Sequence, residues 1–575
     1  ERVDQLQQVP LDLVVLGFAR SLVVDVEDHF SPFTTLDCPG VPPGAMQLIA
    51  KDYRGGQPSG HTIDKAFQCR TVSELSSPFA SGVHVSIDPE VRRLALSCTL
   101  LGYVGPTPPP WLLSALESGL GGVVLFGSNV GDGTGVADLT DRLRGAAGRE
   151  IVIAADEEGG DVTRLDTVRG SSSPGAAALG QLGDISVTEE LHAAIGVRLA
   201  AAGVTLNQAP VADVNVDPLN PVIGLRAFGD DPGVVAEQVA AAVRGLQRTG
   251  IAACLKHFPG HGATRADSHH EVAVLDRSRA ELAAVELPAF QAGIAAGARS
   301  VMIGHLLAPA LDEERIATVS PAIVTGLLRG ELGFEGAVLS DALEMTALAG
   351  TLGMVEGFVQ ALIAGIDAMQ TGAQDYGYLV GAIPLAVQDA LRSGRLAEAR
   401  LVEAAERTAR LAVAADPNSP VDRTVLDGVA SRCLELIGSL PVLHRPLVVE
   451  CRTRPGMAAG ELPWSLADEL ARLIDGVDGM VVDGPVDGIE LQRRAEGRSL
   501  VVLVRDPDRE SWQQQLIDLA AQHPDAVLVD AGWPAPITFG TPVLRTRGIA
   551  PGLLQAAATI LARRSAPLRR EVDPV

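Results

Sequence analysis

The stretch IAACLKHFPGHGATRADSHH, residues 251–270, joins a strand-like run to a dense group of chemically active side chains. Residues 251–255 are apolar, which is typical of a strand buried in a parallel sheet. The rest contains four of the chain's 11 histidines, Asp267 and Lys256, one of three lysines in the whole sequence. Lysine supplies a compact charge with three rotatable donors, which the more abundant arginine does not supply. We therefore interpret residues 256–270 as the candidate active-site segment.

The same theme repeats on both sides of this stretch. From about residue 95 to 372, short runs of Val, Ile, Ala or Leu alternate with segments of helical period. The predicted strands are 98–103, 122–126, 151–155, 204–208, 251–255, 301–304, 337–340 and 366–370. Eight strands separated by helices favour a (β/α)8 barrel of the TIM type, although an open parallel sheet has the same local pattern.

Polar side chains follow several of these apolar runs at once. The residues in these positions are Asp156, Lys256, His257, His305 and Asp341. In a barrel the carboxyl ends of the strands meet on one face, so we expect these side chains to surround a single pocket. The alternative is that they are polar only because loops are polar.

A second domain is predicted beyond the barrel. Residues 376–414 have a helical composition, and AADPNSPVDR (414–423) has the Pro, Asn and Asp content of a linker. Further strand-like runs follow at 446–450, 479–484, 499–506, 526–532 and 542–546. We therefore predict an N-terminal segment of unknown role (1–87), a catalytic barrel (88–412), a linker (413–424) and a smaller doubly wound α/β domain (425–575).

Composition excludes several classes of partner. The formal net charge of -25 disfavours binding to a phosphate backbone, so we expect no nucleic-acid partner. The apolar stretch from Leu11 to Val26 is interrupted by charges and is shorter than the ~20 residues of a spanning helix, so we expect no membrane segment. The six cysteines are scattered at 38, 69, 98, 254, 433 and 451, which favours a reduced, cytoplasmic protein. A leader removed before Glu1 is the alternative, and the oligomeric state is left open.

Four motifs then carry a resemblance to a known family. KHFPGHGATRADSHH (256–270), DEEGGDVTRL (156–165), IGLRAFGDD (223–231) and SDALEM (340–345) occur in the same order as in the β-N-acetylhexosaminidase branch of glycoside hydrolase family 3, which the chain resembles over about residues 88–412. The resemblance implies a retaining exo-β-N-acetylglucosaminidase acting by double displacement. Its expected partner is a small carbohydrate with a terminal N-acetylglucosamine (GlcNAc), as in muropeptides or chitin fragments.

The resemblance implies that Asp341 is the nucleophile. A carboxylate at a strand exit can attack an anomeric carbon and form a covalent glycosyl-enzyme that water later hydrolyses. The alternative is a helix N-cap, because Ser340 and Asp341 precede a helical segment. Ser340 could fill that role instead.

The resemblance also implies an unusual acid/base, His269 paired with Asp267. Asp267 would orient the imidazole and favour its protonated form near neutral pH. A rival interpretation makes His257, His261, His269 and His270 metal ligands, but the segment has no HExxH or HxH pair, so we predict no metal and no cofactor. A merely structural histidine-rich loop is the third possibility.

For substrate binding the resemblance implies hydrogen bonds from five residues: Asp156, Arg164, Arg226, Lys256 and His257. Purely structural ion pairs are the alternative, Arg226 with Asp230 or Asp231 and Arg164 with Asp161 or Asp166. His305 and Asp312 are given supporting roles only.

One departure from the family pattern is present, since DEEGGD stands where the family usually has DQEGGR. Glu157 and Asp161 are therefore expected to add negative charge beside the pocket and to alter its tolerance for anionic aglycones. Two functional alternatives remain: a phosphorylase on the same fold, since a neutral histidine does not repel phosphate, and a non-catalytic sugar-binding protein.

Overall fold

The computed structural model describes residues 86–267, 271–453, 456, 458–460, 462–534 and 540–563. The segment 1–85, which makes up nearly all of the predicted N-terminal region, lies outside the described residues, as do His269 and His270. Residues from Ile87 onward form one compact unit.

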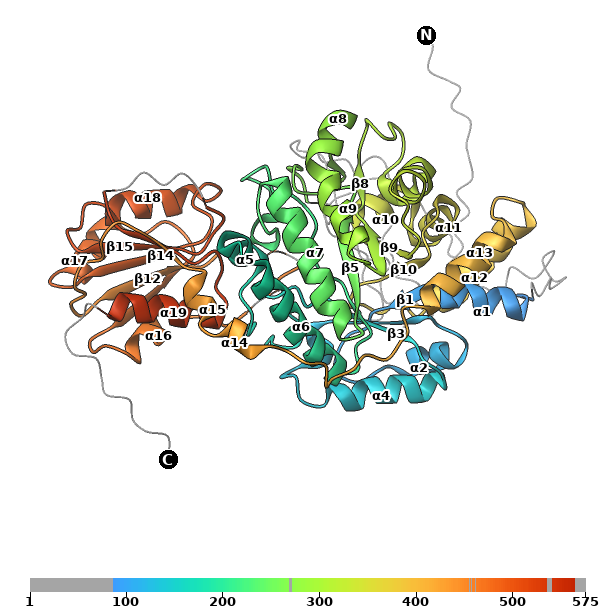
Figure 1. Cartoon of the computed structure of the whole chain (residues 1–575), viewed down its shortest axis with the longest axis horizontal. Helices are drawn as coiled ribbons and strands as arrows, with labels where there is room; N and C mark the ends of the chain where they lie inside the picture. The colour runs from blue at the N-terminus through green and yellow to red at the C-terminus, as the bar shows by residue number, and fades with distance from the viewer. Residues whose placement is uncertain are drawn as a thin grey trace, which may run out of the picture. The chain divides into compact units, whose positions relative to one another are not determined.

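The first part of that unit is a closed barrel of eight parallel strands (Figure 1), so the open-sheet alternative is wrong. The strands follow one another around the barrel in the order β1-β10-β9-β7-β5-β4-β3-β2. Their bounds are β1 (Thr99–Leu101), β2 (Gly122–Leu125), β3 (Val152–Ala155), β4 (Leu206–Asn207), β5 (Ala252–Phe258), β7 (Ser300–Ile303), β9 (Ala337–Ala342) and β10 (Ala368–Gln370). The predicted (β/α)8 barrel is confirmed.

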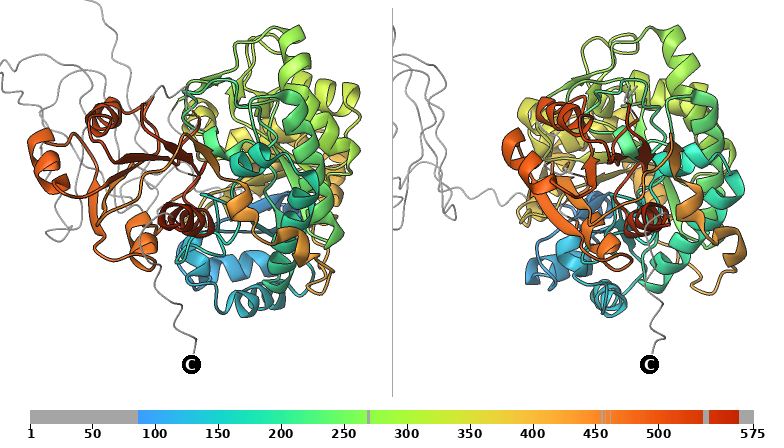
Figure 2. Two further views of the ribbon diagram at one scale, coloured as in Figure 1. Left: turned by 60° about the vertical axis from the view of Figure 1, so that its left-hand side comes forward. Right: turned by 90° about the vertical axis from the view of Figure 1, so that its left-hand side faces the viewer.

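Helices surround these strands on the outside (Figure 2). They are α1 (Pro89–Ser97), α2 (Pro110–Glu117), α3 (Gly127–Val130), α4 (Val136–Ala147), α5 (Ala176–Leu182), α6 (Ile185–Ala201), α7 (Pro232–Arg248), α8 (Arg279–Glu281), α9 (Leu287–Ala295), α10 (Thr346–Leu352), α11 (Met354–Ala364), α12 (Leu379–Arg392) and α13 (Glu398–Ala409). The π-helices η3 (Leu282–Glu286) and η5 (Ala322–Glu331) and the 3₁₀ turns η2 (Gly224–Arg226) and η4 (Ala317–Val319) complete this part. A small two-stranded sheet, β6 (Ala273–Val274) and β8 (Leu306–Leu307), lies beside the barrel sheet.

The longer helices begin where the sequence supplies capping groups. In α7 the Asp231 carboxylate accepts hydrogen bonds from the amides of Gly233 and Val234, at 2.8 and 2.9 Å, and Pro232 occupies the first turn. Asp184 caps α6 in the same way. Such caps satisfy amides that have no partner inside the helix.

The barrel interior is built in layers of alternating residues. Alternate strand residues face inward, because side chains in a strand point to opposite faces with period two. The packed interior comprises Leu100, Val124, Val152, Ala154, Leu206, Ala252, Cys254, Met302, Ala337, Leu339 and Ala368, together with Leu411 and Ala412. These small and branched apolar side chains form the floor on which any site at the carboxyl ends must rest.

The C-terminal part is a six-stranded sheet in the order β11-β16-β15-β14-β12-β13, parallel except for the edge strand β11. Its strands are β11 (Glu435–Ile437), β12 (Leu447–Cys451), β13 (Asp478–Val482), β14 (Leu500–Val504), β15 (Ala526–Asp530) and β16 (Val543–Arg545). Its helices are α16 (Leu466–Ala471), α17 (Gly488–Ala495), α18 (Ser511–Ala520) and α19 (Pro551–Ala562).

Both faces of this sheet are covered (Figure 2). Val448 and Val501 contribute to the core that contains α16 and α19, whereas the neighbouring Val449 and Val502 contribute to the core that contains α17 and α18. The predicted doubly wound domain is confirmed. The antiparallel strand β11 was not predicted, because its residues follow two single-turn helices, α14 (Arg423–Leu426) and α15 (Val429–Arg432).

Hydrogen bonds hold the segment between the two domains against the barrel. The Asp416 amide donates to Thr249 O and the Asp422 amide donates to Glu190 Oε2, each at 2.8 Å.

Within the described part of the chain, no single helix combines the length and apolarity needed to cross a membrane. Helices α10 and α11 meet that test only as a pair bent by 103°.

Candidate active site

The uppermost inward-facing layer of the barrel contains three of the predicted site residues, Asp156, Lys256 and Asp341. Side chains along a strand alternate between the two faces, so the residue two positions after the last packed interior residue also faces inward. In the eight strands these residues are Gly102, Phe126, Asp156, Gln208, Lys256, Gly304, Asp341 and Gln370. Burial raises the pKa of the Cys254 thiol, in the layer below, to about 12, and the charges of Asp156 and Asp341 add to that rise. Both carboxylates are therefore within electrostatic reach of the same interior thiol. Asp156 and Asp341 thus face a common space although they are far apart in sequence.

Three predicted exit residues, Lys256, His257 and Asp341, lie inside strands instead of after them. β5 extends through Lys256 and His257 to Phe258, and β9 extends through Asp341 to Ala342. The extension of β5 is held by Lys256, whose amide donates to Pro210 O at 3.3 Å and whose carbonyl accepts from Ala212 N at 2.7 Å. These backbone bonds fix the direction of the Lys256 side chain.

Lys256 bridges two carboxylates. Its Nζ lies 2.6 Å from Asp156 Oδ1 and 2.7 Å from Glu158 Oε1, and the side chain is only 2% exposed. Burial lowers the pKa of Lys256, but the two carboxylates outweigh this effect and hold the pKa above its ordinary value. The ammonium is therefore a permanent cation at neutral pH.

Glu158 is the second anchor of this cluster and was missed from the sequence. It accepts two hydrogen bonds from Arg226, from Nε at 2.9 Å and from Nη2 at 2.8 Å. Burial raises the pKa of Glu158, but Arg226 and Lys256 together hold it well below its usual range. The expected alternative partners of Arg226, Asp230 and Asp231, are not its partners, because Arg226 turns back toward the β3 exit.

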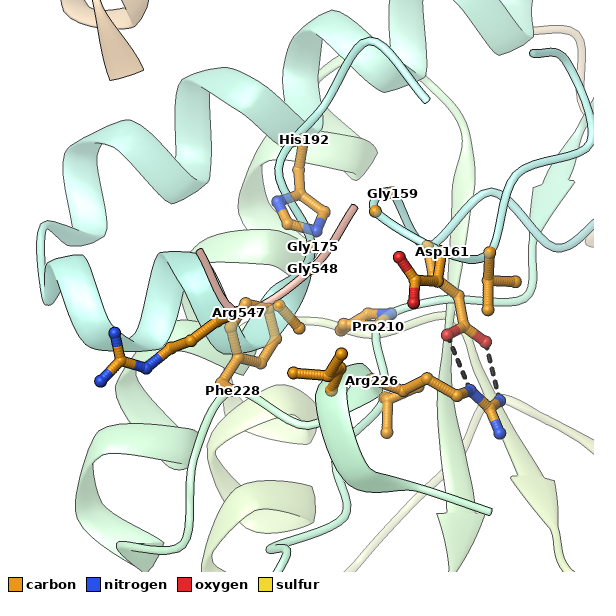
Figure 3. A pocket seen from close by; sticks show the side chains of 15 residues that line it. Gly159, Asp161, Gly175, His192, Pro210, Arg226, Phe228, Arg547 and Gly548 are labelled. Carbon is orange, nitrogen blue, oxygen red and sulfur yellow. Dashed lines mark hydrogen bonds and ion pairs between the residues drawn. The ribbon is translucent and has the colours of Figure 1, made fainter. Parts of the chain in front are cut away.

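The ion pair between Glu158 and Arg226 also forms one wall of a pocket (Figure 3). Other lining residues include His192 and Phe228 from the barrel and Arg547 and Gly548 from the C-terminal domain. His192 Nδ1 lies 2.8 Å from Thr188 O, and burial lowers the pKa of this imidazole to about 4. His192 is therefore neutral at physiological pH and carries no charge into the pocket.

Arg164 links the cluster to the C-terminal domain. Its Nη2 donates to Asp156 Oδ2 at 3.4 Å and to Ala458 O at 3.1 Å. The alternative partners expected for Arg164 are engaged elsewhere: Asp161 pairs with Arg505 of the C-terminal domain, and Asp166 lies 2.7 Å from Arg198. Arg164 is thus available to the site, and a backbone carbonyl of the second domain helps to position it.

The expectation that Glu157 and Asp161 add negative charge beside the pocket is wrong for Glu157, whereas Asp161 does line the pocket. Glu157 turns into the loop, where it accepts from the Thr163 hydroxyl at 2.7 Å and from the amides of Arg164 and Leu165 at 2.8 and 3.0 Å. Burial raises its pKa. Asp161 is neutralised by Arg505. Glu157 therefore holds the loop, and Asp161 lines the pocket while its charge is paired with Arg505.

A buried aspartate, Asp213, organises the histidine segment and was also missed. Its carboxylate lies 2.8 Å from His257 Nδ1 and accepts from the His261 amide at 2.7 Å. Nδ1 of His257 consequently carries the proton, which leaves Nε2 as the outward acceptor, 3.5 Å from Arg226 Nη2. His257 therefore presents a fixed tautomer beside the charged cluster.

His261 is not available as a charged group. Its Nδ1 lies 2.5 Å from the Thr264 hydroxyl, and burial lowers its pKa to about 4. The neighbouring Asp267 lies at the edge of the described residues, and its predicted partner His269 lies outside them. Among the residues with described positions, no group of three or more His, Cys, Asp or Glu could hold a metal ion.

Asp341 lies in β9 and does not cap a helix, because α10 begins at Thr346 and its N-cap residue is Met345. Asp341 Oδ1 accepts a hydrogen bond from the Ala342 amide at 2.8 Å. His305 supports this strand end, with Nε2 2.9 Å from Ala342 O. The Ser340 hydroxyl, which was a candidate helix cap, instead accepts a hydrogen bond from the backbone N–H of Gln370 at 3.3 Å.

Of the supporting residues predicted from the sequence, Asp312 serves a loop instead of the site. It accepts from the Ser320 hydroxyl at 2.6 Å.

The carboxyl end of the closed barrel gathers fixed cations, carboxylates and amides, and this is the face where barrel enzymes place their active sites. A family model described as "Glycosyl hydrolase family 3 N terminal domain" matches residues 114–411, more than half of the chain. The chain therefore belongs to glycosyl hydrolase family 3.

Individual relatives agree with this placement. The chain is 35% identical over 283 residues to "Beta-hexosaminidase A" of Pseudoalteromonas piscicida, a match that covers 45% of this chain and 47% of the relative. It is 42% identical over 235 residues to "Beta-hexosaminidase" of Stenotrophomonas maltophilia (strain K279a), covering 39% of this chain and 68% of that relative. The chain thus spans about half the length of the first of these relatives.

A solved structure extends the similarity beyond the barrel. The glycoside hydrolase family 3 β-N-acetylglucosaminidase from Paenibacillus sp. str. FPU-7 superposes with a TM-score of 0.74 at 30% identity, over 82% of this chain and 96% of that chain. Because the match covers 82% of this chain, more than the barrel alone supplies, it includes part of the C-terminal domain as well as the barrel.

Proposed function

We propose that the protein is a retaining, exo-acting β-N-acetylglucosaminidase that removes a terminal GlcNAc from muropeptides or chitin-type oligosaccharides. The observation that carries this proposal is the shared inward layer, in which Asp341 faces the same space as Asp156 and Lys256. The names of the family relatives support the choice of a hexosaminide substrate.

The charged cluster suits the binding of the terminal sugar. Asp156 and Glu158 accept hydrogen bonds from hydroxyls, whereas Lys256, Arg226 and Arg164 donate them. Because these groups already hold one another in place, little side-chain freedom is lost when a sugar binds. The ion pairs among these side chains therefore also hold them in position for binding a sugar.

The reaction then proceeds by two displacements at the anomeric carbon. Asp341 forms a bond to that carbon while the bond to the glycosidic oxygen breaks, and the imidazolium of His269 gives its proton to the departing oxygen. In the second step the neutral imidazole takes a proton from water, the water oxygen bonds to the anomeric carbon, and Asp341 leaves. Two inversions give net retention.

The histidines inside the described structure support the choice of His269 as the acid/base. His257 Nδ1 is committed to Asp213, and His261 Nδ1 contacts Thr264. His261 is not a proton donor near neutral pH, since burial lowers its pKa to about 4. Asp267 and His269 therefore remain the acid/base pair that we propose from the sequence.

The direct test is release of nitrophenol from 4-nitrophenyl N-acetyl-β-glucosaminide. We expect rapid release by the wild type and loss of at least about three orders of magnitude in kcat for Asp341→Asn, which removes the attacking carboxylate. Asp389→Asn, on the exposed side of α12, is the matched control. Turnover that requires inorganic phosphate and yields a sugar phosphate would indicate the phosphorylase instead. Binding of GlcNAc without any turnover would indicate the sugar-binding protein.

A further inference from the structure

A buried asparagine, Asn220, joins the segment that carries the histidines to the turn that carries Arg226. Asn220 is 3% exposed and lies in the loop between β4 and η2. Its Nδ2 donates two hydrogen bonds, to His261 O at 2.8 Å and to Thr264 O at 3.0 Å. Its Oδ1 accepts two, from the backbone N–H groups of residue 222 at 2.9 Å and residue 223 at 2.8 Å. Both donors and both acceptor positions of this amide are therefore used, and a flipped amide would satisfy none of them.

The acceptor side of Asn220 supports the turn that presents Arg226. Val222 and Ile223, whose N–H groups bond to Asn220, hold Arg226 through their carbonyls. Val222 O accepts from Arg226 Nη1 at 3.2 Å, and Ile223 O accepts from the Arg226 amide at 2.9 Å. Arg226 in turn is paired with Glu158 at the barrel mouth (Figure 3). The Asn220 oxygen therefore fixes the backbone from which one cation of the proposed sugar site extends.

The donor side of Asn220 holds the start of the segment that leads to Asp267. A turn joins the two carbonyls that it contacts, since the Thr264 amide donates to His261 O at 3.3 Å. Asp267 follows this turn by three residues, and its carbonyl accepts from the Glu271 amide at 3.0 Å. The two Asn220 donors therefore hold the chain immediately before the proposed acid/base pair.

Burial makes these two donors difficult to replace. His261 and Thr264 are 1% and 0% exposed, so water cannot bond to their carbonyls unless the turn moves outward. We propose that Asn220 is a positioning residue that holds the acid/base segment in register with the Arg226 turn, so that proton transfer to the leaving oxygen depends on its two donors; this rests on the proposed function.

The test compares two substrates that differ in how far the leaving group needs a proton, phenyl and 3,4-dinitrophenyl N-acetyl-β-glucosaminide. Asn220→Asp keeps an oxygen that accepts from Val222 and Ile223. Its second carboxylate oxygen replaces the donors and repels the His261 and Thr264 carbonyls. We expect kcat/KM for the phenyl substrate to fall roughly 10- to 100-fold, because phenolate departs poorly without an acid. The value for the dinitrophenyl substrate should change by no more than about threefold, because dinitrophenolate departs without one.

Asn129→Asp is the matched control. Asn129 is 4% exposed, and its Nδ2 likewise donates to two carbonyls, Tyr103 O at 3.0 Å and Gly105 O at 2.8 Å. Its Oδ1 accepts from the Phe126 amide at 2.8 Å. The substitution therefore makes the same chemical change in the loops that follow β1 and β2, instead of the loop that follows β5. Any fall in kcat/KM in this variant should be equal for the two substrates.

An equal fall with both substrates in Asn220→Asp would overturn the positioning role and leave the proposed hydrolase intact. A wild type that hydrolyses neither substrate would refute the proposed function, and the positioning role with it. Thermal unfolding checks that each variant is folded. Asn220→Ser, which keeps a single donor, is the milder second variant and should show the same dependence on the leaving group with a smaller fall.

Hydrogen–deuterium exchange tests the same contact without turnover. Peptides within residues 259–267 contain the amides of His261 and Thr264, which are bonded in the wild type. We expect these peptides to exchange faster in Asn220→Asp and at the wild-type rate in Asn129→Asp. Unchanged exchange in Asn220→Asp would overturn the proposal.

Discussion

Each end of the barrel buries a cluster of ion pairs, and the two clusters differ in whether they border the inward layer of the site. At the carboxyl end, Lys256 and Arg226 hold Asp156 and Glu158 around the mouth. Before β10, at the amino end, Asp367 is fully buried and paired with Arg329 at 2.6 Å, and also with Arg400 and Arg407. The first cluster borders the inward layer, whereas the second ties helices to the barrel.

This difference separates stability from activity. The Arg329 and Arg400 guanidiniums come from η5 and α13, so Asp367 fastens both helices to the start of β10. In barrel enzymes the amino-terminal face serves stability and the carboxyl face serves chemistry. Substitutions at the amino-end cluster should therefore lower the free energy of unfolding and leave turnover nearly unchanged. Substitutions at the carboxyl-end cluster should mainly lower turnover.

The largest effect on stability is expected from Asp367→Asn. It leaves several buried guanidiniums without their shared carboxylate, and breaking a buried pair in this way costs about 3–5 kcal/mol. Denaturant unfolding should show this loss, while kcat of the remaining folded enzyme stays close to the wild-type value. Asp389→Asn, at an exposed position, should change the free energy of unfolding by less than about 0.5 kcal/mol. A large loss of kcat with unchanged stability would reverse the assignment of the two ends.

The next largest effect is expected from Lys256→Met, which removes the cation between Asp156 and Glu158. We expect kcat/KM to fall on the order of 100-fold, since two buried carboxylates lose a charged hydrogen-bond donor. Lys256→Arg keeps the charge but replaces a compact ammonium with a planar fork, so we expect little recovery. Full activity in the Arg variant would show that charge alone is sufficient at this position.

Glu286 gives a smaller effect that depends on pH. This carboxyl, at the end of η3, is fully buried, and neither oxygen has a hydrogen-bond partner in the described structure. Burial and the nearby Asp213 raise its pKa to about 8. The folded state thus holds a proton that the unfolded state releases above its ordinary pKa of 4.5. Its contribution to stability is complete below that pH and is lost as the pH rises toward 8.

Glu286→Gln removes this dependence, because the amide stays neutral. We expect the variant to be more stable than the wild type at pH 8.5 by roughly 2 kcal/mol, with a smaller difference at pH 5. Urea unfolding at both pH values is the measurement. Parallel losses of stability in the two proteins would exclude Glu286 as the titrating group.

The smallest effect concerns the contact between the domains. Arg505→Ala removes the partner of Asp161, in the loop that also carries Asp156 and Arg164. We expect KM to rise about two- to threefold with kcat unchanged, since an interaction of this kind contributes about 1 kcal/mol or less. Arg493→Ala, which removes an exposed pair on α17, is the control and should leave KM unchanged. A fall in kcat alone would contradict a role in holding the binding loop.

The sequence predicted the barrel well because strands and helices differ in hydrophobic period, and each of the eight predicted strands overlaps an observed strand. It located Asp156, Lys256 and Asp341 because polar residues interrupt or follow apolar runs. It missed Glu158 and Asp213, whose partners Arg226 and His257 are 68 and 44 residues away. Such pairs form only when the barrel closes, so no local pattern reports them.

Gln208 and Gln370 were missed for a different reason. Both follow an inward residue by two positions, Leu206 and Ala368, so alternation alone could have placed them in the layer of the site. Their neutral side chains carry no signal of their own. The expected charge of Glu157 beside the pocket was wrong because the sequence does not show which way a loop side chain turns.

The most direct test of the central claim, that Asp341 attacks the sugar from the inward layer of the barrel, is to trap the glycosyl-enzyme. The protein would be quenched during turnover of a slow fluorinated N-acetylglucosaminyl donor, and its peptides would be mapped by mass spectrometry. We expect one N-acetylhexosaminyl adduct on the peptide that contains Asp341, and no adduct in Asp341→Asn. An adduct on another residue, or a product of inverted anomeric configuration, would contradict it.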